Sequence, residues 1–170
     1  GIFPFGTEKL SGGELQTDAA QIFAAQESPL GQEMVGWQVL QCAKDGFQSL
    51  ASRGGKLLAY QGWNDGLTSP EATIDYFEQL GSVRQAADYA RLFMVPGMQH
   101  CGGGTGTDRF DPLRALEDWV ERGIAPDRIE AARIVDDAQV RSRPLCPYPQ
   151  TARYRGTGNS DQSGSFVCAN

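Results

Sequence analysis

The sequence of 170 residues lacks the features that mark several common protein classes. No apolar stretch approaches the length needed to cross a bilayer, which argues against a membrane protein. The 15 basic residues are outnumbered by 21 acidic ones and form no run, so nucleic acid is not an expected partner. The N-terminus has neither the basic region nor the long apolar region of a signal peptide.

Histidine and cysteine are too scarce for a typical metal site. His100 is the only histidine, and the four cysteines (Cys42, Cys101, Cys146 and Cys168) include no Cys-x-x-Cys pair, so a structural zinc site is not expected. Four cysteines allow three pairings. Cys146 and Cys168 flank a tail rich in Pro, Gly and Ser, which a disulfide would stabilise if the protein matures in an oxidising compartment. The alternative is four reduced, buried thiols.

The middle of the chain has the pattern of an α/β sheet. Short apolar runs bounded by glycine or proline predict strands at 56–61 and 89–95, and a further extended segment at 129–135. Serine or aspartate before proline, with glycine at the far end, predicts helices at 69–81 and 111–123. Alternating strands and helices favour an open sheet with parallel strands.

The two ends of the chain are less regular. Residues 1–50 form a poorly defined N-terminal segment, with short helices expected at 18–26 and 42–51. Residues 51–170 are expected to form the main domain. Its polar tail after residue 135 reads as loop, without regular secondary structure.

An acid and a base follow the two predicted strands. Asp65 lies in a Trp-Asn-Asp-Gly turn after the first strand, and His100 precedes Cys-Gly-Gly-Gly after the second. Sites in open α/β sheets lie outside the carboxyl ends of the strands, and acid before histidine is the α/β-hydrolase order. The histidine would act as general base and the carboxylate would fix its tautomer. The simpler interpretation is a turn-forming aspartate and a surface histidine.

A nucleophile to complete such a triad is missing. Four serines precede Asp65, at positions 11, 28, 49 and 52, and none lies in Gly-x-Ser-x-Gly. Ser11 precedes two glycines, but no apolar strand leads into it. The glycine run after His100 also matches neither a dinucleotide-binding fingerprint nor a phosphate loop.

Several segments together resemble the tannase and feruloyl esterase family. They are Gly-Gly-Lys-Leu-Leu (54–58), Gly-Trp-Asn-Asp (62–65), Val-Pro-Gly-Met-Gln-His-Cys-Gly-Gly-Gly (95–104), Ala-Leu-Glu-Asp-Trp-Val-Glu (115–121) and Arg-Pro-Leu-Cys-Pro-Tyr-Pro (143–149). The likeness runs from about residue 54 to residue 168 and does not include residues 1–50. The resemblance implies an α/β-hydrolase that cleaves esters of phenolic acids such as gallate or hydroxycinnamate. It makes Asp65 the triad acid and His100 the base.

The resemblance also implies roles for the cysteines. Cys146 and Cys168 match the family's closing disulfide, so the expected fold is the C-terminal part of an α/β-hydrolase sheet with a disulfide-clamped tail. In the family, the cysteine after the catalytic histidine is bridged to a cysteine beside the nucleophilic serine, which ties the two catalytic loops together. The partner of Cys101 is therefore expected outside this chain, with Cys42 as the less favoured alternative.

These inferences predict the C-terminal part of a larger secreted or periplasmic serine esterase. The serine would lie on an N-terminal part or a second chain, and residues 1–50 could be the return from a lid. This chain alone would be inactive. No cofactor is expected here, and a calcium ion would belong to the lid. Two alternatives remain open: a non-catalytic α/β binding module, and a complete small hydrolase with an unconventional nucleophile.

Overall fold

The computed structural model describes residues 49–79 and 86–170. They belong to the second of two units into which the chain divides, Phe47–Asn170. The helix predicted at 18–26 and the predicted end of a helix at Gly81 lie outside the described residues, as does most of the N-terminal segment. Residues 49–52 are helical, and this turn of helix ends before Gly54, which has a φ of 77°.

The two predicted strands form a parallel pair. β1 (Leu57–Gly62) runs beside β2 (Ala90–Val95) in a register that pairs the first residues with each other and the last with each other. Both strands lie within one residue of the prediction. The chain leaves β1 and β2 at the same end, so the loops that carry the predicted acid and base start side by side.

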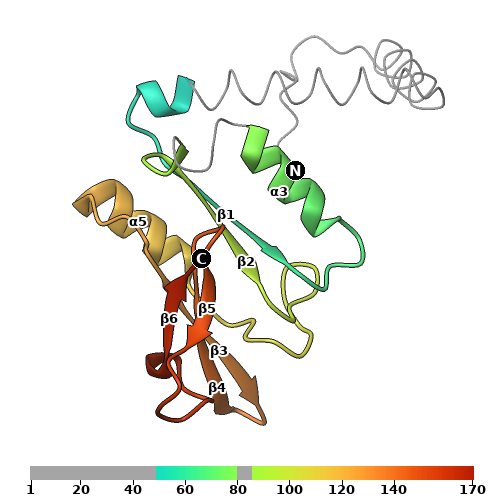
Figure 1. The fold of residues 1–170 in the computed structure, drawn as a ribbon. Coiled ribbons are helices and arrows are strands. Elements are labelled where there is room, and N and C mark those ends of the chain that lie inside the picture. The colour runs from blue at the N-terminus through green and yellow to red at the C-terminus, as the bar shows by residue number, and fades with distance from the viewer. Residues whose placement is uncertain (1–48, 80–85) are drawn as a thin grey trace, which may run out of the picture. The chain divides into compact units, whose positions relative to one another are not determined.

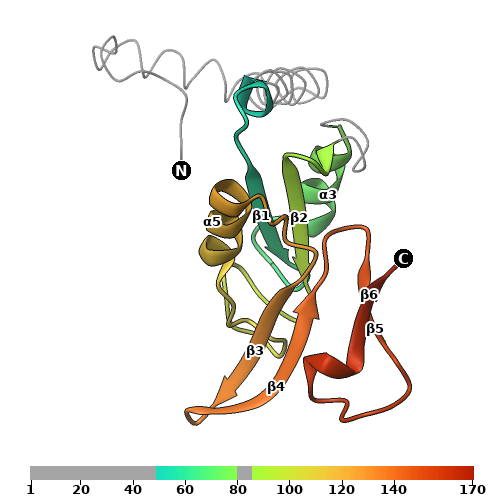
Figure 2. The ribbon, with the colours of Figure 1, turned by 90° about the vertical axis from the view of Figure 1, so that its left-hand side faces the viewer.

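Two helices cover opposite faces of this strand pair (Figures 1 and 2). α3 (Pro70–Gln79) contacts both strands on one face, and α5 (Pro112–Arg122) contacts β1 on the other. α5 has the ends that its sequence predicts. The Asp111 carboxylate accepts a hydrogen bond from the Arg114 amide at 2.9 Å, and Gly123 takes the left-handed conformation that closes the helix.

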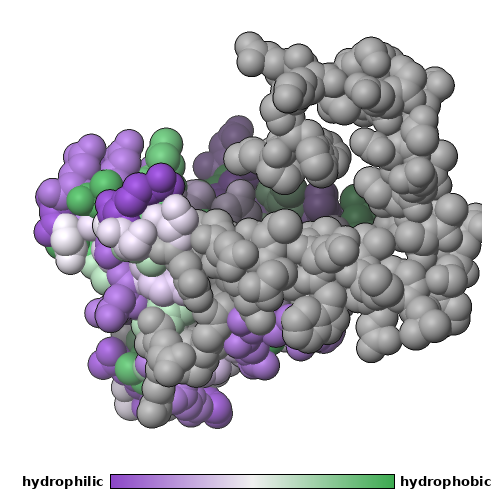
Figure 3. Space-filling model, turned by 90° about the horizontal axis from the view of Figure 1, so that it is seen from above, coloured by the Kyte–Doolittle hydropathy of each residue, from purple (hydrophilic) through white to green (hydrophobic). Residues whose placement is uncertain are grey.

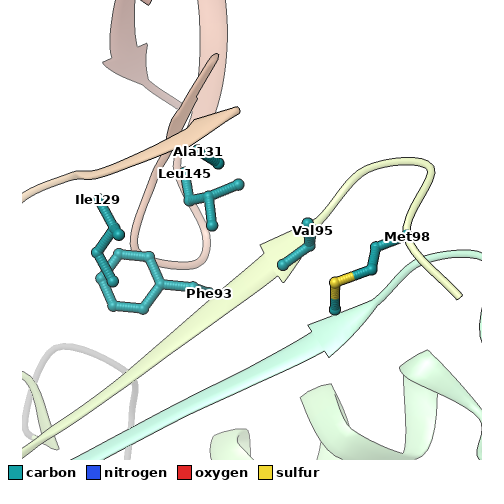
Figure 4. Packing of buried hydrophobic residues seen from close by; sticks show 6 residues of the cluster. All are labelled: Phe93, Val95, Met98, Ile129, Ala131 and Leu145. Atoms are coloured by element: carbon teal, nitrogen blue, oxygen red, sulfur yellow. The ribbon is translucent and has the colours of Figure 1, made fainter. Parts of the chain in front are cut away.

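The core consists of two clusters, one on each face of β2, because successive side chains of a strand point to opposite faces. The α3 face holds Phe77, Ala86, Ala90, Leu92 and Met94. The opposite face holds Phe93, Val95, Met98, Ile129, Ala131 and Leu145 (Figure 4). The second cluster includes a residue of the loop after β2, Met98, which is 1% exposed. Packing of Met98 therefore anchors the start of the loop that carries His100.

The C-terminal region contains more strands than the sequence predicted. The predicted extended segment is β3 (Ile129–Val135), which pairs antiparallel with β4 (Ala138–Leu145). The turn between them has two residues, Asp136 and Asp137, both with positive φ (49° and 62°), which is the geometry of a type I′ hairpin. Glycine is the usual residue in such turns, and its absence here hides the hairpin from sequence reading.

The prediction of a loop-like tail is therefore wrong. A second antiparallel pair, β5 (Thr151–Tyr154) and β6 (Phe166–Ala169), follows β4, with a short 3₁₀ turn at Ser163–Ser165 before β6. The Cys146–Cys168 disulfide joins the end of β4 to β6, as expected. The low apolar content of the tail misled the prediction, since a covalent link replaces part of the hydrophobic burial that strands of this length need.

The segment after β4 covers the edge of β2 that faces away from β1. Pro147 forms an antiparallel bridge with Phe93, and the Tyr148 amide donates to the carbonyl of Leu92 at 2.7 Å. The Tyr148 hydroxyl also donates to Glu78 of α3 at 2.9 Å. These contacts join the disulfide-linked tail to the strand that leads to His100.

The face shown in Figure 3 is mostly hydrophilic where it is described, with smaller hydrophobic areas between. Large apolar side chains that are exposed among the described residues include Leu67, Leu113, Val120 and Ile124. Within the described ranges, no helix combines the length and the apolarity that crossing a bilayer requires.

Candidate active site

The loops after β1 and β2 approach each other closely at Gly62. A Cβ atom at this position would overlap the carbonyl oxygens of Met98 and Gln99, so only glycine fits without a shift of the backbone. Two backbone hydrogen bonds continue the contact beyond the strands: Trp63 donates to Val95 at 3.0 Å, and the amide after it donates to Met98 at 2.9 Å. The two loops are thus held together by main-chain atoms before any side chain contributes.

The structure brings the two predicted side chains into contact. Nδ1 of His100 lies 2.7 Å from Oδ2 of Asp65. The Asp65 side chain is 2% exposed, whereas that of His100 is 48% exposed. An ionised carboxylate only accepts hydrogen bonds, so Nδ1 carries the proton in this contact. Nε2 is then the ring nitrogen left for exchange with a reacting group.

Asp65 receives hydrogen bonds on both carboxylate oxygens. Oδ2, the oxygen that faces the imidazole, also accepts from the Thr68 hydroxyl and from Nε2 of Gln61, each at 2.6 Å. Oδ1 accepts from the amides of Leu67 and Thr68 at 2.8 and 3.1 Å. The Thr68 hydroxyl, more than any other group, holds the pKa of the Asp65 carboxyl far below its usual range, against the opposing effect of burial. Asp65 is therefore a fixed negative charge at neutral pH.

Gln61 and Thr68 are site residues that the sequence analysis missed. Thr68 could have been found, because an aspartate whose side chain accepts amides two and three residues later forms a recognisable Asx turn. Gln61 had a weaker signal. It is a polar residue near the end of β1, a mostly half-buried strand, and its Oε1 accepts from the hydroxyl of Thr73 on α3 at 3.4 Å.

Neither Cys101 nor the serines that precede Asp65 complete the site within the described residues. Cys101 is exposed and forms no disulfide with any described residue, and Cys42 lies outside the described ranges. Ser49 and Ser52 lie in the helical turn before β1, whereas Asp65 follows β1, so these hydroxyls are at the opposite end of the strand (Figure 1). The role of Cys101 stays a prediction.

No group of three or more His, Cys, Asp or Glu side chains forms a candidate metal site in residues 49–79 and 86–170. The calcium ion expected for a lid would lie outside these residues, and no chemical step below involves one.

The chain is similar to known esterases. The sequence model of a family described as tannase and feruloyl esterase matches residues 14–169. Over 121 residues the chain is 52% identical to mono(2-hydroxyethyl) terephthalate hydrolase of Piscinibacter sakaiensis, which covers 69% of this chain and 20% of that protein. It is 37% identical over 131 residues to a probable feruloyl esterase of Arthroderma benhamiae, covering 71% of this chain and 24% of that protein.

A solved structure supports the same relationship. Feruloyl esterase B from Aspergillus oryzae matches with a TM-score of 0.64 and 28% identity, covering 72% of this chain and 28% of that chain. The chain thus spans about a fifth to a third of the length of the curated relatives it matches.

Proposed function

The chain belongs to the tannase and feruloyl esterase family, and we propose that it supplies the acid and the base of a Ser-Asp-His triad that hydrolyses carboxylic esters. Asp65 is the acid and His100 the base, and the serine lies outside this chain. The observation that carries this proposal is the 2.7 Å contact between Nδ1 of His100 and the buried carboxylate of Asp65. The β1–β2 pair between α3 and α5 then belongs to an α/β-hydrolase sheet, whose acid and histidine follow neighbouring strands.

The chemistry follows from the charge of each group. Nε2 of His100 takes the proton of the serine hydroxyl while the serine oxygen attacks the ester carbonyl carbon. The imidazolium, stabilised by Asp65, returns that proton to the alcohol oxygen as its bond to the acyl carbon breaks. A water molecule then attacks the acyl-enzyme with His100 again as base, releasing the acid and restoring the serine. Because the pKa of Asp65 is held low, the carboxylate stays ionised throughout.

The substrate class comes from what the relatives act on. Two relatives are named for feruloyl esters and one for a terephthalate monoester. In each of these esters the acyl group comes from an aromatic carboxylic acid. We assign this chain to esters of phenolic acids, such as gallates and hydroxycinnamates, with terephthalate monoesters as related substrates. The residues that select among them would lie in the part of the enzyme that carries the serine.

We also assign the protein to an oxidising compartment, secreted or periplasmic. The support is the Cys146–Cys168 disulfide, a bond that persists outside the reducing cytosol. The family resemblance implies in addition that Cys101, exposed next to His100, forms a disulfide with a cysteine near the serine.

The test compares the chain alone with the chain expressed together with the polypeptide encoded immediately upstream. Hydrolysis of methyl gallate, methyl ferulate and mono(2-hydroxyethyl) terephthalate is followed by chromatography of the released acids. We expect turnover only from the combined protein. His100→Ala should lower kcat by about 10²–10⁴-fold, the usual contribution of a general base.

Asp65→Asn should also lower kcat, and Asp75→Asn is the matched control because Asp75 is an exposed carboxylate of α3. Turnover by the isolated chain that His100→Ala abolishes would show that the serine does not lie outside it. Turnover that survives both His100→Ala and Asp65→Asn would rule out the proposed acid and base. The absence of hydrolysis in every preparation would favour the non-catalytic binding module.

A further inference from the structure

The loop that carries His100 has almost no side chains with which to fix its shape. Residues 99–106 contain four glycines and no large apolar residue. Glycine loses more conformational freedom on folding than any other residue. A general base must nevertheless be held to within a fraction of an ångström. Met98 anchors the start of the loop, and the amides of Thr105 and Gly106 donate to the carbonyl of Gly97 at 2.9 and 3.1 Å. Side chains from outside the loop add to these backbone bonds.

Arg133 of β3 supplies one such group. Its Nη1 donates to the carbonyl oxygen of Gly104 at 2.7 Å and to that of Gly106 at 3.3 Å. Arg133 is partly buried, and no carboxylate among residues 49–79 and 86–170 forms an ion pair with it. The register of the β3–β4 ladder shifts after Arg133, where the partner strand β4 has one extra residue, Val140.

Asp108 binds the neighbouring glycine of this loop, Gly103, through its N–H group. Its Oδ2 accepts a hydrogen bond from the Gly103 amide at 2.8 Å, and its side chain is 11% exposed. An anion thus binds the N–H of one glycine, and a cation binds the C=O of the next. Backbone bonds between Arg109 and Ala132, at 2.7 and 3.0 Å, connect this end of the loop to β3 directly before Arg133.

We propose that Asp108 and Arg133 are positioning residues for the base of the esterase: by binding opposite ends of the Gly103–Gly104 segment, they hold His100 against Asp65. This proposal rests on the proposed function for its effect on turnover, but its structural part does not. It gives the C-terminal hairpin a role in the active site, although neither β3 nor β4 contributes a reacting group. Arg133 acts through the loop, since its hydrogen bonds go to the carbonyls of Gly104 and Gly106 and not to the imidazole.

The test uses the fact that His100 is the only histidine of the chain, so every imidazole signal belongs to it. A two-bond proton–nitrogen spectrum of the 170-residue chain identifies which ring nitrogen carries the proton, and the hydrogen-bonded Nδ1–H gives a separate downfield resonance. We expect Arg133→Met to weaken that downfield resonance and to populate the Nε2–H tautomer. Arg128→Met is the matched control, because Arg128 lies one residue before β3 and forms an exposed ion pair with Glu130.

A second variant, Arg133→Lys, separates positioning from general stability. Lysine keeps the charge but lacks the planar fork of the guanidinium, so we expect a folded protein with a partial loss of the Nδ1–H resonance. In the combined enzyme, Arg133→Lys should lower kcat by about tenfold or more with KM unchanged, since a misplaced base costs rate and not binding.

Imidazole spectra of Arg133→Lys and Arg133→Met that match the Arg128→Met control, at equal folded fraction by circular dichroism, would overturn the positioning role. That result would leave the assignment of Asp65 and His100 intact. The opposite result, a changed spectrum in a protein whose turnover does not depend on His100, would keep the positioning of the loop and refute the proposed function.

Discussion

Removing the Cys146–Cys168 disulfide should destabilise the protein mainly by increasing the conformational entropy of the unfolded chain. The bond joins residues 22 apart, and the loop-entropy relation gives about 3 kcal/mol of stabilisation at 25 °C for a loop of this length. The double substitution C146S/C168S is therefore expected to lower the free energy of unfolding by about 3 kcal/mol. Both substitutions are needed because a single one leaves a reactive thiol.

The folded tail should survive this change because other contacts hold it. The β5–β6 ladder remains, the Arg141 guanidinium pairs with Asp161 at 3.0 Å, and the Tyr148 amide still donates to Leu92. The imidazole spectrum of His100 should consequently be the same in C146S/C168S and in the unsubstituted chain. A loss of stability without a change at the site is the signature of an effect on the unfolded state.

The measurement is urea unfolding followed by far-ultraviolet circular dichroism and by tryptophan fluorescence, to which Trp119, 4% exposed, contributes. For a chain of this size, about 3 kcal/mol corresponds to a melting temperature lowered by roughly 6–12 °C. The slope of free energy against urea should rise slightly, because the unfolded chain without the link exposes more surface. Cys101→Ser is the control and should leave stability unchanged, since its thiol is exposed and forms no disulfide in the described residues.

Two results would refute this reasoning. A loss below about 1 kcal/mol would mean that the unfolded chain gains little freedom, contrary to the loop-entropy relation. Separate transitions for the two optical probes would mean that the tail unfolds independently of the β1–β2 layer. The disulfide would then stabilise only the tail that it closes.

Two further predictions concern single hydrogen bonds. Asp111→Ala removes the N-cap of α5 and should cost about 1 kcal/mol of unfolding free energy, and Asp111→Asn, which keeps an acceptor, should cost clearly less when both are measured by urea titration. The hydrogen bond that Tyr148 donates to Glu78, together with burial, raises the pKa of the Tyr148 hydroxyl. The folded state then holds this proton more tightly than the unfolded state. The stability that the hydrogen bond contributes is therefore complete below the ordinary tyrosine pKa and is lost as the pH rises through the raised pKa of the folded state. Tyr148→Phe should cost about 1 kcal/mol or less at pH 7 and should reduce the loss of stability between neutral and strongly alkaline pH; an unchanged alkaline slope would contradict the role of this bond.

The strands and helices that carry the site could be predicted because the sequence signals for them are local. The apolar residues of β2 alternate between two cores, and Asp111 and Gly123 mark the ends of α5. The same local signals placed Asp65 and His100 after parallel strands, and their proximity follows from that topology. Their catalytic role remains a prediction, since a 2.7 Å contact establishes a geometry and not a reaction.

The parts that could not be predicted depend on contacts without a sequence signature. Asp136 and Asp137 form a tight turn without the glycine that usually marks one, so the β3–β4 hairpin was hidden. Arg133 binds carbonyl oxygens of glycines 27 and 29 residues earlier, and a carbonyl is common to every residue type. No pattern of side chains could have indicated that partner.

These two classes of contact explain how the proposed acid and base, two of the three residues of a triad, can be ordered before a nucleophile is present. Every bond that orients Asp65 comes from β1, from the turn that follows it or from His100. The loop of His100 is held by Met98 in the core and by backbone contacts that extend to β3. None of these groups belongs to a serine-bearing loop. A serine brought to this surface would therefore meet an acid and a base already in contact, and its own placement, not a rearrangement of Asp65 and His100, would determine the rate.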